Sequence, residues 1–221
     1  MPSEHSDYAA NYTLSYYFSS LKVIMGEELA RCSPSVYLSL GAHSSLCMEQ
    51  ILRHGTKEQK HEYLPRLNRG EIIGCLAMSE AEAGSDVVSM TTRARRDDDE
   101  NGNDPNQSDW ILDGSKFWIT NGPIADLAVV YAKTSVIPGK PQHGLTAFLV
   151  ETSNLEGFRP GIPLDKLGHR GSSTGELIFD GCRLPAKAVL GKEGKGVYVL
   201  MTGLDYEVRN LILSFNISIN E

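Results

Sequence analysis

The feature of this sequence that most constrains its fold is the spacing of apolar residues, which changes near Gly70 and again near Gly194. From about residue 21 to residue 69, apolar residues recur three and four positions apart, as in amphipathic helices. Between residues 71 and 185, short segments rich in β-branched and aromatic residues are separated by Gly, Pro, Asn or Asp, as in strands joined by turns. Because the helical period returns after Gly194, we predict an α+β chain in which a β domain is inserted between helical parts.

Spacing and composition together divide the chain into segments. The predicted segments are an atypical N-terminal stretch at 1–20, a partial helical domain at 21–70, a β domain at 71–185, the start of a second helical domain at 186–207 and an atypical tail at 208–221.

Local signals mark the helix ends in the first helical part. Ser33 and Pro34 predict a break between the first two helices. Thr56 and Gln59 have the spacing of a capping box, which predicts that a third helix begins after Thr56. Pro65 predicts that this helix is short, because a proline inside a helix removes a hydrogen bond.

Composition excludes several classes of function. A chain of 221 residues can bury one substantial core or two small ones. Its net charge is -7 and its 21 Lys and Arg residues are scattered, so we predict no nucleic-acid partner, which would need a clustered basic face. No apolar run is long enough to cross a bilayer, so we predict no membrane span.

The cysteines and histidines do not indicate a metal site. The four Cys residues are far apart, form no CxxC pair and follow no secretory signal, so we predict reduced thiols in an intracellular protein. His54 and His61 lie two helical turns apart, but no third ligand is near them in the sequence. We therefore predict a solvated helix face at these histidines and no bound metal.

The first candidate site is LAMSEAEAGSDVVS, residues 76–89, at the exit of a predicted strand. We expect the small residues Ala83, Gly84 and Ser85 to form a turn that exposes backbone N–H groups, with the Ser79 hydroxyl beside it. Such a turn can hold a phosphate or a polar heteroaromatic ring. Taken alone, these residues favour a simpler alternative, a hairpin turn capped by serine, and no GxGxxG fingerprint is present.

The second candidate is KFWITNG, residues 116–122. Trp118 and Thr120 lie at the end of a predicted strand, where an indole and a hydroxyl can flank a flat ring and donate a hydrogen bond to it. Taken alone, Trp118 is better explained as a core residue.

The third candidate is Glu207 in GVYVLMTGLDYE. We predict a helix here with Val197, Leu200, Met201 and Leu204 on one face, and Glu207 falls on the same side. Desolvation against apolar surface raises a carboxyl pKa toward the value of a general base. The alternative, a helix that ends here with its carboxylate in water, fits these residues equally well.

Together the three stretches resemble the acyl-CoA dehydrogenase family, and LDKLGHRGSSTGELIFDGCRLP resembles the strand pair that ends its β domain. The resemblance runs from about Val23 to Glu207. LSLGAHSSLC, EIIGCLAMSE and VYVLMTGLDYE are most similar to the isovaleryl-CoA dehydrogenase branch. The implied fold is a partial N-terminal helical domain followed by a β-barrel or sandwich middle domain, with the C-terminal four-helix bundle missing and the chain truncated at both ends.

The resemblance implies FAD as the cofactor and conversion of isovaleryl-CoA to 3-methylcrotonyl-CoA, a step of leucine catabolism. Glu207 corresponds to the base that removes a proton beside the thioester. The residues implied to meet the flavin are Leu76, Met78, Ser79, Gly84, Ser85, Trp118, Ile119 and Thr120. The residues implied to meet the acyl-CoA are Ser85, Tyr198, Asp205 and Arg209.

The resemblance also implies partners and a compartment. Electrons would pass to an electron-transferring flavoprotein, and members of the family form homotetramers. The implied location is the mitochondrial matrix, although residues 1–20 do not resemble a transit peptide.

The chain departs from the family pattern in two places. Val208 stands where the family has Arg, with Arg209 one position later, and Gln142-His143 replaces a Ser-Arg pair that touches the CoA. The alternatives to an active dehydrogenase are a truncated subunit without catalysis and the translation of a misread gene model. An acyl-CoA oxidase shares the fold, but the placement of Glu207 disfavours it.

Overall fold

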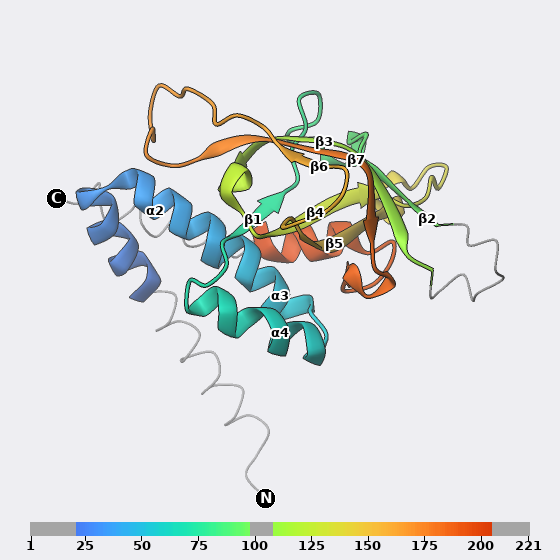
Figure 1. The fold of residues 1–221 in the computed structure, drawn as a ribbon, viewed down its shortest axis with the longest axis horizontal. Coiled ribbons are helices and arrows are strands. Elements are labelled where there is room, and N and C mark those ends of the chain that lie inside the picture. The colour runs from blue at the N-terminus through green and yellow to red at the C-terminus, as the bar shows by residue number, and fades with distance from the viewer. Residues whose placement is uncertain (1–20, 98–107, 205–221) are drawn as a thin grey trace, which may run out of the picture.

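The computed structural model describes residues 21–97 and 108–204. In this part of the chain, a layer of helices lies along one face of a twisted β-sheet, and the last helical residues, 196–204, pack on that same face (Figure 1). The chain forms helices first, then strands and then a helix again, in the order that the hydrophobic period predicts. The α+β prediction is therefore confirmed.

The first helical part contains a break where it was predicted. The Ser33 hydroxyl accepts a hydrogen bond from the Val36 N–H at 3.4 Å and so caps the second helix. A π-helical stretch that the sequence did not predict continues that helix. The elements are a helix at residues 21–32, α2 (Pro34–Gly41), the π-helix η1 (Ala42–Met48), α3 (Glu49–His54) and α4 (Lys57–Asn68).

Helix α4 begins with the predicted capping box. The Gln59 N–H donates to the Thr56 hydroxyl at 3.2 Å, and the Thr56 N–H donates to the Gln59 side chain at 3.0 Å. The prediction that Pro65 shortens this helix is wrong. The helix runs to Asn68, because the Pro65 carbonyl still accepts a hydrogen bond from the Arg69 N–H at 3.1 Å.

The described strands form one sheet of mixed direction. Their order is β6-β7-β3-β2-β4-β5-β8, and β1 pairs in parallel with β4 outside this path. The strands are β1 (Gly74–Ala77), β2 (Arg93–Arg96), β3 (Trp110–Thr120), β4 (Leu127–Lys133), β5 (Leu145–Glu151), β6 (Phe158–Pro160), β7 (Thr174–Leu184) and β8 (Val189–Leu190).

Short 3-10 turns join several strands. One further strand, β8, lies outside the predicted β region. The turns are η2 (Val87–Ser89), η3 (Gly122–Ile124), η4 (Pro141–Gly144) and η5 (Ala186–Ala188). Strand β8 lies in the segment predicted as the start of the second helical part, yet it pairs with β5. A strand of two residues is too short to show a period, so only its pairing reveals it.

Both faces of β4 are buried, because its side chains alternate between two apolar clusters. Leu127, Val129 and Tyr131 pack with helical residues that include Ile51 and Leu67. The residues between them face a second cluster that comes mainly from strands. The sheet therefore separates a helix-facing core from a core within the β domain.

No helix in the part of the chain that the structure describes is long and apolar enough to cross a membrane.

Candidate functional site

A small cavity of about 140 Å³ lies where β1 and β3 end. It brings together side chains of the first and second candidate stretches with two residues of the π-helix. The lining residues are Ala42, Leu46, Leu76, Met78, Ser79, Trp118, Ile119 and Thr120. The last six are among the residues that the sequence analysis assigned to the flavin.

Trp118 owes its position in this cavity to a β-bulge. The pairing of β3 with β7 shifts register between Lys116 and Ile119, and Trp118 has a left-handed backbone with φ 63. Its side chain is 59% exposed, whereas the neighbouring Ile119 is buried. The interpretation of Trp118 as a core residue is therefore wrong, because the bulge turns it outward.

Gly84 and Ser85 are not part of the lining of this cavity. They are exposed and follow a tight turn in which the Glu80 N–H donates to the Ala83 carbonyl at 2.9 Å and the Ala83 N–H donates to the Glu80 carbonyl at 3.3 Å. The hydrogen-bonded turn therefore spans residues 80–83 and ends where the predicted turn of Ala83, Gly84 and Ser85 was expected to begin. The roles of Gly84 and Ser85 toward a ligand stay predictions.

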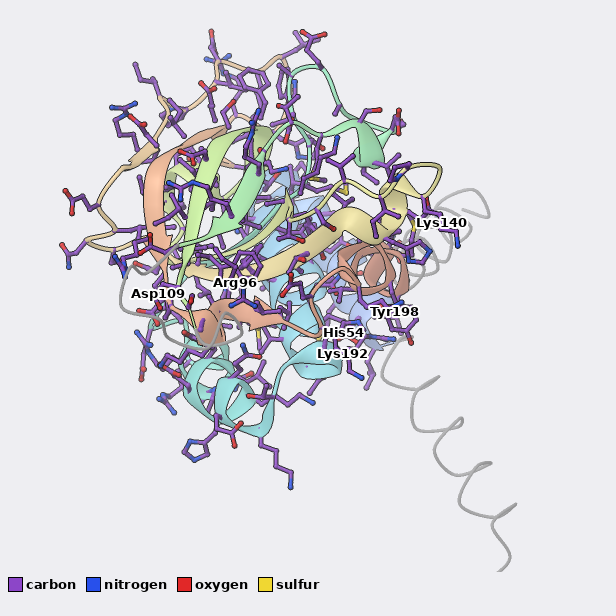
Figure 2. All side chains as sticks on the ribbon, turned by 90° about the vertical axis from the view of Figure 1, so that its right-hand side faces the viewer. His54, Arg96, Asp109, Lys140, Lys192 and Tyr198 are labelled. Atoms are coloured by element: carbon purple, nitrogen blue, oxygen red, sulfur yellow. The ribbon has the colours of Figure 1, made fainter. Side chains whose placement is uncertain are left out.

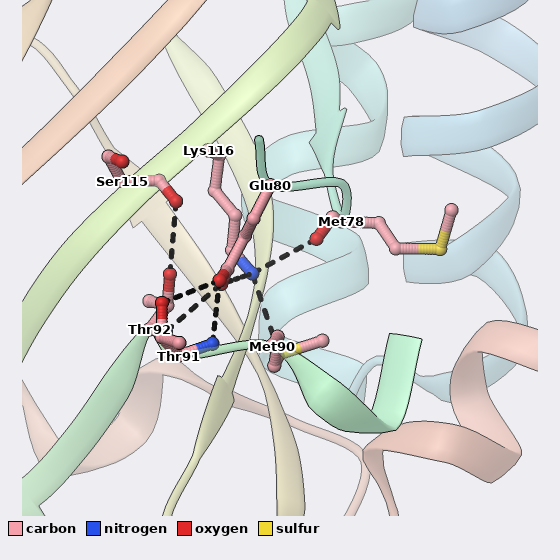
Figure 3. Close-up of polar contacts among 7 residues, drawn as sticks. All are labelled: Met78, Glu80, Met90, Thr91, Thr92, Ser115 and Lys116. Carbon is pink, nitrogen blue, oxygen red and sulfur yellow. Dashed lines mark hydrogen bonds and ion pairs between the residues drawn. The ribbon is translucent and has the colours of Figure 1, made fainter. Parts of the chain in front are cut away.

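A buried ion pair lies beside the cavity, and the sequence analysis missed it (Figure 3). The Lys116 ammonium group donates to the Glu80 carboxylate at 2.9 Å and to the Met78 carbonyl at 3.0 Å. The same carboxylate accepts hydrogen bonds from the Thr91 N–H at 2.6 Å, the Thr91 hydroxyl at 2.7 Å and the Thr92 N–H at 3.0 Å. A signal existed in the sequence, because a lysine inside a strand of buried residues needs a partner.

The surroundings keep this pair ionised near neutral pH. Burial alone raises the pKa of Glu80, but the hydrogen bonds from Thr92 and Thr91 and the charge of Lys116 lower it to about 2. Burial lowers the pKa of Lys116 to about 8, against the opposing effect of Glu80. Between these two values, the carboxylate and the ammonium group are both charged.

A second cavity, of about 770 Å³, lies at the start of the last helix. Its described lining includes arginine, lysine and histidine side chains but no aspartate or glutamate. Tyr198 stands at this cavity with its ring edge-on to His54, the ring centroids 5.8 Å apart, and Lys192 lies nearby (Figure 2). Gln142 and His143, the pair that departs from the family pattern, line it as well. The chain is acidic overall, so this concentration of basic groups favours an anionic ligand.

His54 is held neutral in this second cavity. Burial and the charges of Arg53 and Lys60 lower the pKa of His54 below its usual value of 6.5. Its Nε2 lies 2.8 Å from the Thr202 hydroxyl, which ties the ring to the last helix. Among the described residues, no group of three or more His, Cys, Asp or Glu is arranged to hold a metal ion.

The last helix is present at residues 196–204, but its buried face differs from the prediction. Leu200 is buried as expected, whereas Met201 is 43% exposed and Val199 takes a buried position instead. Gly203 lies close against the buried side chain of Gln50. The predicted site residues Asp205, Glu207 and Arg209 lie outside the described residues.

A larger groove, of about 1120 Å³, lies between the helices and contains none of the predicted site residues. Its lining is mainly apolar and includes Leu40, Leu52 and Ile124. The predicted site residues that do line a cavity are therefore found at the two smaller ones.

Comparison with known proteins finds two domains of one family in this chain. The acyl-CoA dehydrogenase N-terminal domain matches residues 17–71, and the acyl-CoA dehydrogenase middle domain matches residues 75–182. The mitochondrial isovaleryl-CoA dehydrogenase of Pongo abelii is 54% identical over 185 residues, which are 84% of this chain and 41% of that protein. This chain thus spans about two fifths of the length of the curated relatives it matches.

Solved structures share the fold. A glutaryl-CoA dehydrogenase from Mycobacterium smegmatis in complex with FADH2 has a TM-score of 0.75 and 37% identity, over 87% of this chain and 45% of that chain. A chain from a structure of the electron transferring flavoprotein of Acidaminococcus fermentans has a TM-score of 0.75 and 38% identity, over 83% and 45%. The two matched domains, the order of the elements and the shared fold have one explanation: this chain belongs to the acyl-CoA dehydrogenase family.

Proposed function

We propose that this chain forms the flavin- and acyl-CoA-binding part of an FAD-dependent dehydrogenase that oxidises isovaleryl-CoA to 3-methylcrotonyl-CoA in leucine catabolism. The observation that carries this proposal is the cavity at the ends of β1 and β3, which gathers six predicted flavin residues from two stretches far apart in the sequence. The name of the Pongo abelii relative supports the choice of acyl group.

The residues of this cavity fit a flat, polar heteroaromatic ring. Trp118 offers an exposed indole face for stacking, and Ser79 and Thr120 offer hydroxyl groups that can donate or accept hydrogen bonds. Leu76 supplies apolar contact beside them. The complex of the mycobacterial relative with FADH2 supports FAD as the group that binds.

The second cavity fits the phosphate-bearing end of an acyl-CoA. His143, Lys192 and Lys195 line it, and Tyr198 offers an aromatic edge beside them. An ammonium group binds a phosphate as a point charge, so the exact Ser-Arg pair of the family is not essential for this contact.

The contribution of the chain to the reaction is to orient the thioester and to move one proton. The carbonyl makes the adjacent C–H acidic, and we assign Glu207 as the general base that removes this proton. FAD, when bound, supplies the acceptor for the hydride that leaves the β-carbon. Exclusion of water around Glu207 would keep its pKa high enough for a base.

The partners of the whole protein follow from the same proposal. Electrons would leave to an electron-transferring flavoprotein, and the Acidaminococcus fermentans neighbour, from a structure named for such a protein, supports this. A mitochondrial matrix location is supported by the names of the curated relatives. A homotetramer is the assembly that the family resemblance implies.

The test is a titration of the 221-residue chain with FAD, followed by isovaleryl-CoA in the absence of oxygen. We expect FAD to bind and the flavin absorbance to bleach when the thioester is added. Failure to bind FAD would contradict the proposal. Binding without bleaching would indicate a subunit without catalysis, and rapid oxygen consumption would indicate an oxidase.

Two variants separate binding from chemistry. Glu207→Gln is expected to bind FAD as the unmodified chain does and to lose bleaching, because an amide cannot accept the proton. Trp118→Ala is expected to weaken FAD binding by about tenfold or less, since it removes one aromatic contact. Bleaching at an unchanged rate in Glu207→Gln would show that another group is the base.

A further inference from the structure

We propose that Glu80 and Lys116 are positioning residues that hold the two flavin-facing stretches, residues 76–79 and 118–120, at a fixed separation. The inference rests on the proposed function, because it concerns the same cavity. It adds two residues that do not line the cavity and whose position relative to it only the structure reveals.

The sheet itself does not fix this separation. Within the described residues, β1 pairs with β4, and β3 pairs with β2 and β7. No ladder of hydrogen bonds joins β1 to β3 in this part of the chain. The two strand ends that form the cavity are therefore held by other contacts.

Two adjacent residues of β3 supply those contacts. The Lys116 ammonium group donates to the Met78 carbonyl at 3.0 Å, and the Phe117 N–H donates to the Ser79 carbonyl at 2.8 Å. Two consecutive carbonyls of the first stretch are thus bound immediately before Trp118. A shift of Lys116 would move Met78 and Trp118, which both line the cavity.

Glu80 fixes Lys116 in turn. Its carboxylate binds the ammonium group and also three donors of Thr91 and Thr92, just before β2 begins (Figure 3). The side chain of Lys116 has no exposed surface, and that of Glu80 is 6% exposed. The ammonium group therefore has a single location, between β1, the start of β2 and β3.

Stability alone does not account for an ion pair at this place. Apolar residues of similar volume often replace a buried ion pair with no loss of stability. Apolar side chains would not bind the Met78 carbonyl, so they would not fix the direction of that peptide group. What the ion pair adds is geometry at the edge of the cavity.

The test compares the unmodified chain with the double variant Glu80→Gln/Lys116→Met, which removes both charges together. We expect FAD binding to be weakened by about 10- to 100-fold beyond the loss seen in a control of equal melting temperature, as when a group that orients a binding residue is lost. Leu190→Ala, at a buried position of β8, is the control for general destabilisation. The proposal would be overturned if the double variant lost no more FAD affinity than a control variant with the same melting temperature.

A second readout does not need the flavin. The chain contains two tryptophans, Trp110 and Trp118, at opposite ends of β3, so fluorine NMR of the 5-fluorotryptophan-labelled chain gives one signal from each. We expect the Trp118 signal to shift or broaden in the double variant while the Trp110 signal stays unchanged. An unchanged Trp118 signal, or equal changes in both signals, would overturn the proposal. If the unmodified chain binds no FAD, the proposed function fails, while this measurement still tests the positioning role.

Discussion

At the scale of single residues, Glu80 shows how burial and hydrogen bonding compete. Its carboxylate is buried, which disfavours charge, yet several donors converge on it and lower its pKa from 4.5 to about 2. Because the folded pKa lies below the unfolded one, the unfolded chain binds more protons between these values. The charged carboxylate thus stabilises the fold above pH 4.5, and this contribution is lost as the pH falls toward 2.

The expected size of this effect is about 3 kcal/mol in the free energy of unfolding. Urea unfolding of the unmodified chain at a series of pH values should show stability falling on acidification through this range. Glu80→Gln has no proton to gain at this position, so its stability should fall less steeply. If the stability of both proteins fell equally with pH, the lowered pKa of Glu80 would not be the cause of the acid sensitivity.

Asn121 is a second residue whose role depends on tertiary contacts. It has φ 63, and its side-chain amide donates to the Ser39 carbonyl at 2.8 Å and to the Gly74 carbonyl at 3.3 Å. The turn after β3 is therefore fastened to α2 and to β1. The spacing of residues along the sequence gave no sign of these two acceptors.

Asn121→Ala is expected to lower the free energy of unfolding by about 2 to 4 kcal/mol, because it loses both hydrogen bonds and keeps a backbone conformation that alanine disfavours. Asn121→Gly loses the same bonds without that backbone cost, so it should be less destabilising by about 1 kcal/mol. Urea unfolding of both variants checks this. An equal loss of unfolding free energy in the two variants would show that the backbone at position 121 is not strained.

At the scale of elements, β1 and the π-helix η1 approach each other closely at Gly74. A Cβ atom on Gly74 would lie 2.6 Å from the Cys47 sulfur and 2.9 Å from the Cys47 Cβ. Cys47 is fully buried, and burial raises the pKa of its thiol to about 12, so it packs as a small apolar group. The glycine permits this contact between helix and strand.

Gly74→Ala is expected to destabilise the protein by about 1 to 3 kcal/mol, because the added methyl group has no room in a packed core. Gly168→Ala is the matched control, since a Cβ atom there meets nothing within 4 Å and the residue is exposed. Thermal or urea unfolding of the pair gives the comparison. Similar stability in both variants would mean that β1 and η1 can separate at no cost.

At the scale of the whole molecule, Gln59 joins the helical layer to the end of the β domain. Its side chain is buried and donates to the Lys187 carbonyl at 2.9 Å and to the Val189 carbonyl at 3.0 Å. The same side chain accepts the hydrogen bond from the Thr56 N–H that completes the capping box. One residue therefore acts both within its helix and between layers.

Gln59→Ala is expected to cost about 2 kcal/mol in the free energy of unfolding, because it leaves two part-buried carbonyls without their donor. Thr56→Ala removes only the local cap and should cost about 1 kcal/mol. Urea unfolding monitored by circular dichroism distinguishes them. Equal losses would show that the contact between the layers adds nothing to the cap.

The sequence by itself determined the features that depend on neighbouring residues. The change of hydrophobic period placed the helices and strands, and the Thr56 and Gln59 pair placed the start of α4. The motifs carried the resemblance that identified the family and six residues of the cavity. These features are readable because a period or a cap is set by spacing along the chain.

Only the tertiary structure decided what meets across the chain. The outward position of Trp118 depends on its strand's register against β7. The Glu80–Lys116 pair depends on the ends of β1 and β3, which no ladder joins within the residues that the structure describes. Likewise, the packing of the last helix buries Val199 and leaves Met201 exposed, against the predicted stripe. Local spacing fixes which faces of an element are apolar, but the partner that covers each face comes from residues distant in sequence, and that choice sets the geometry of the site.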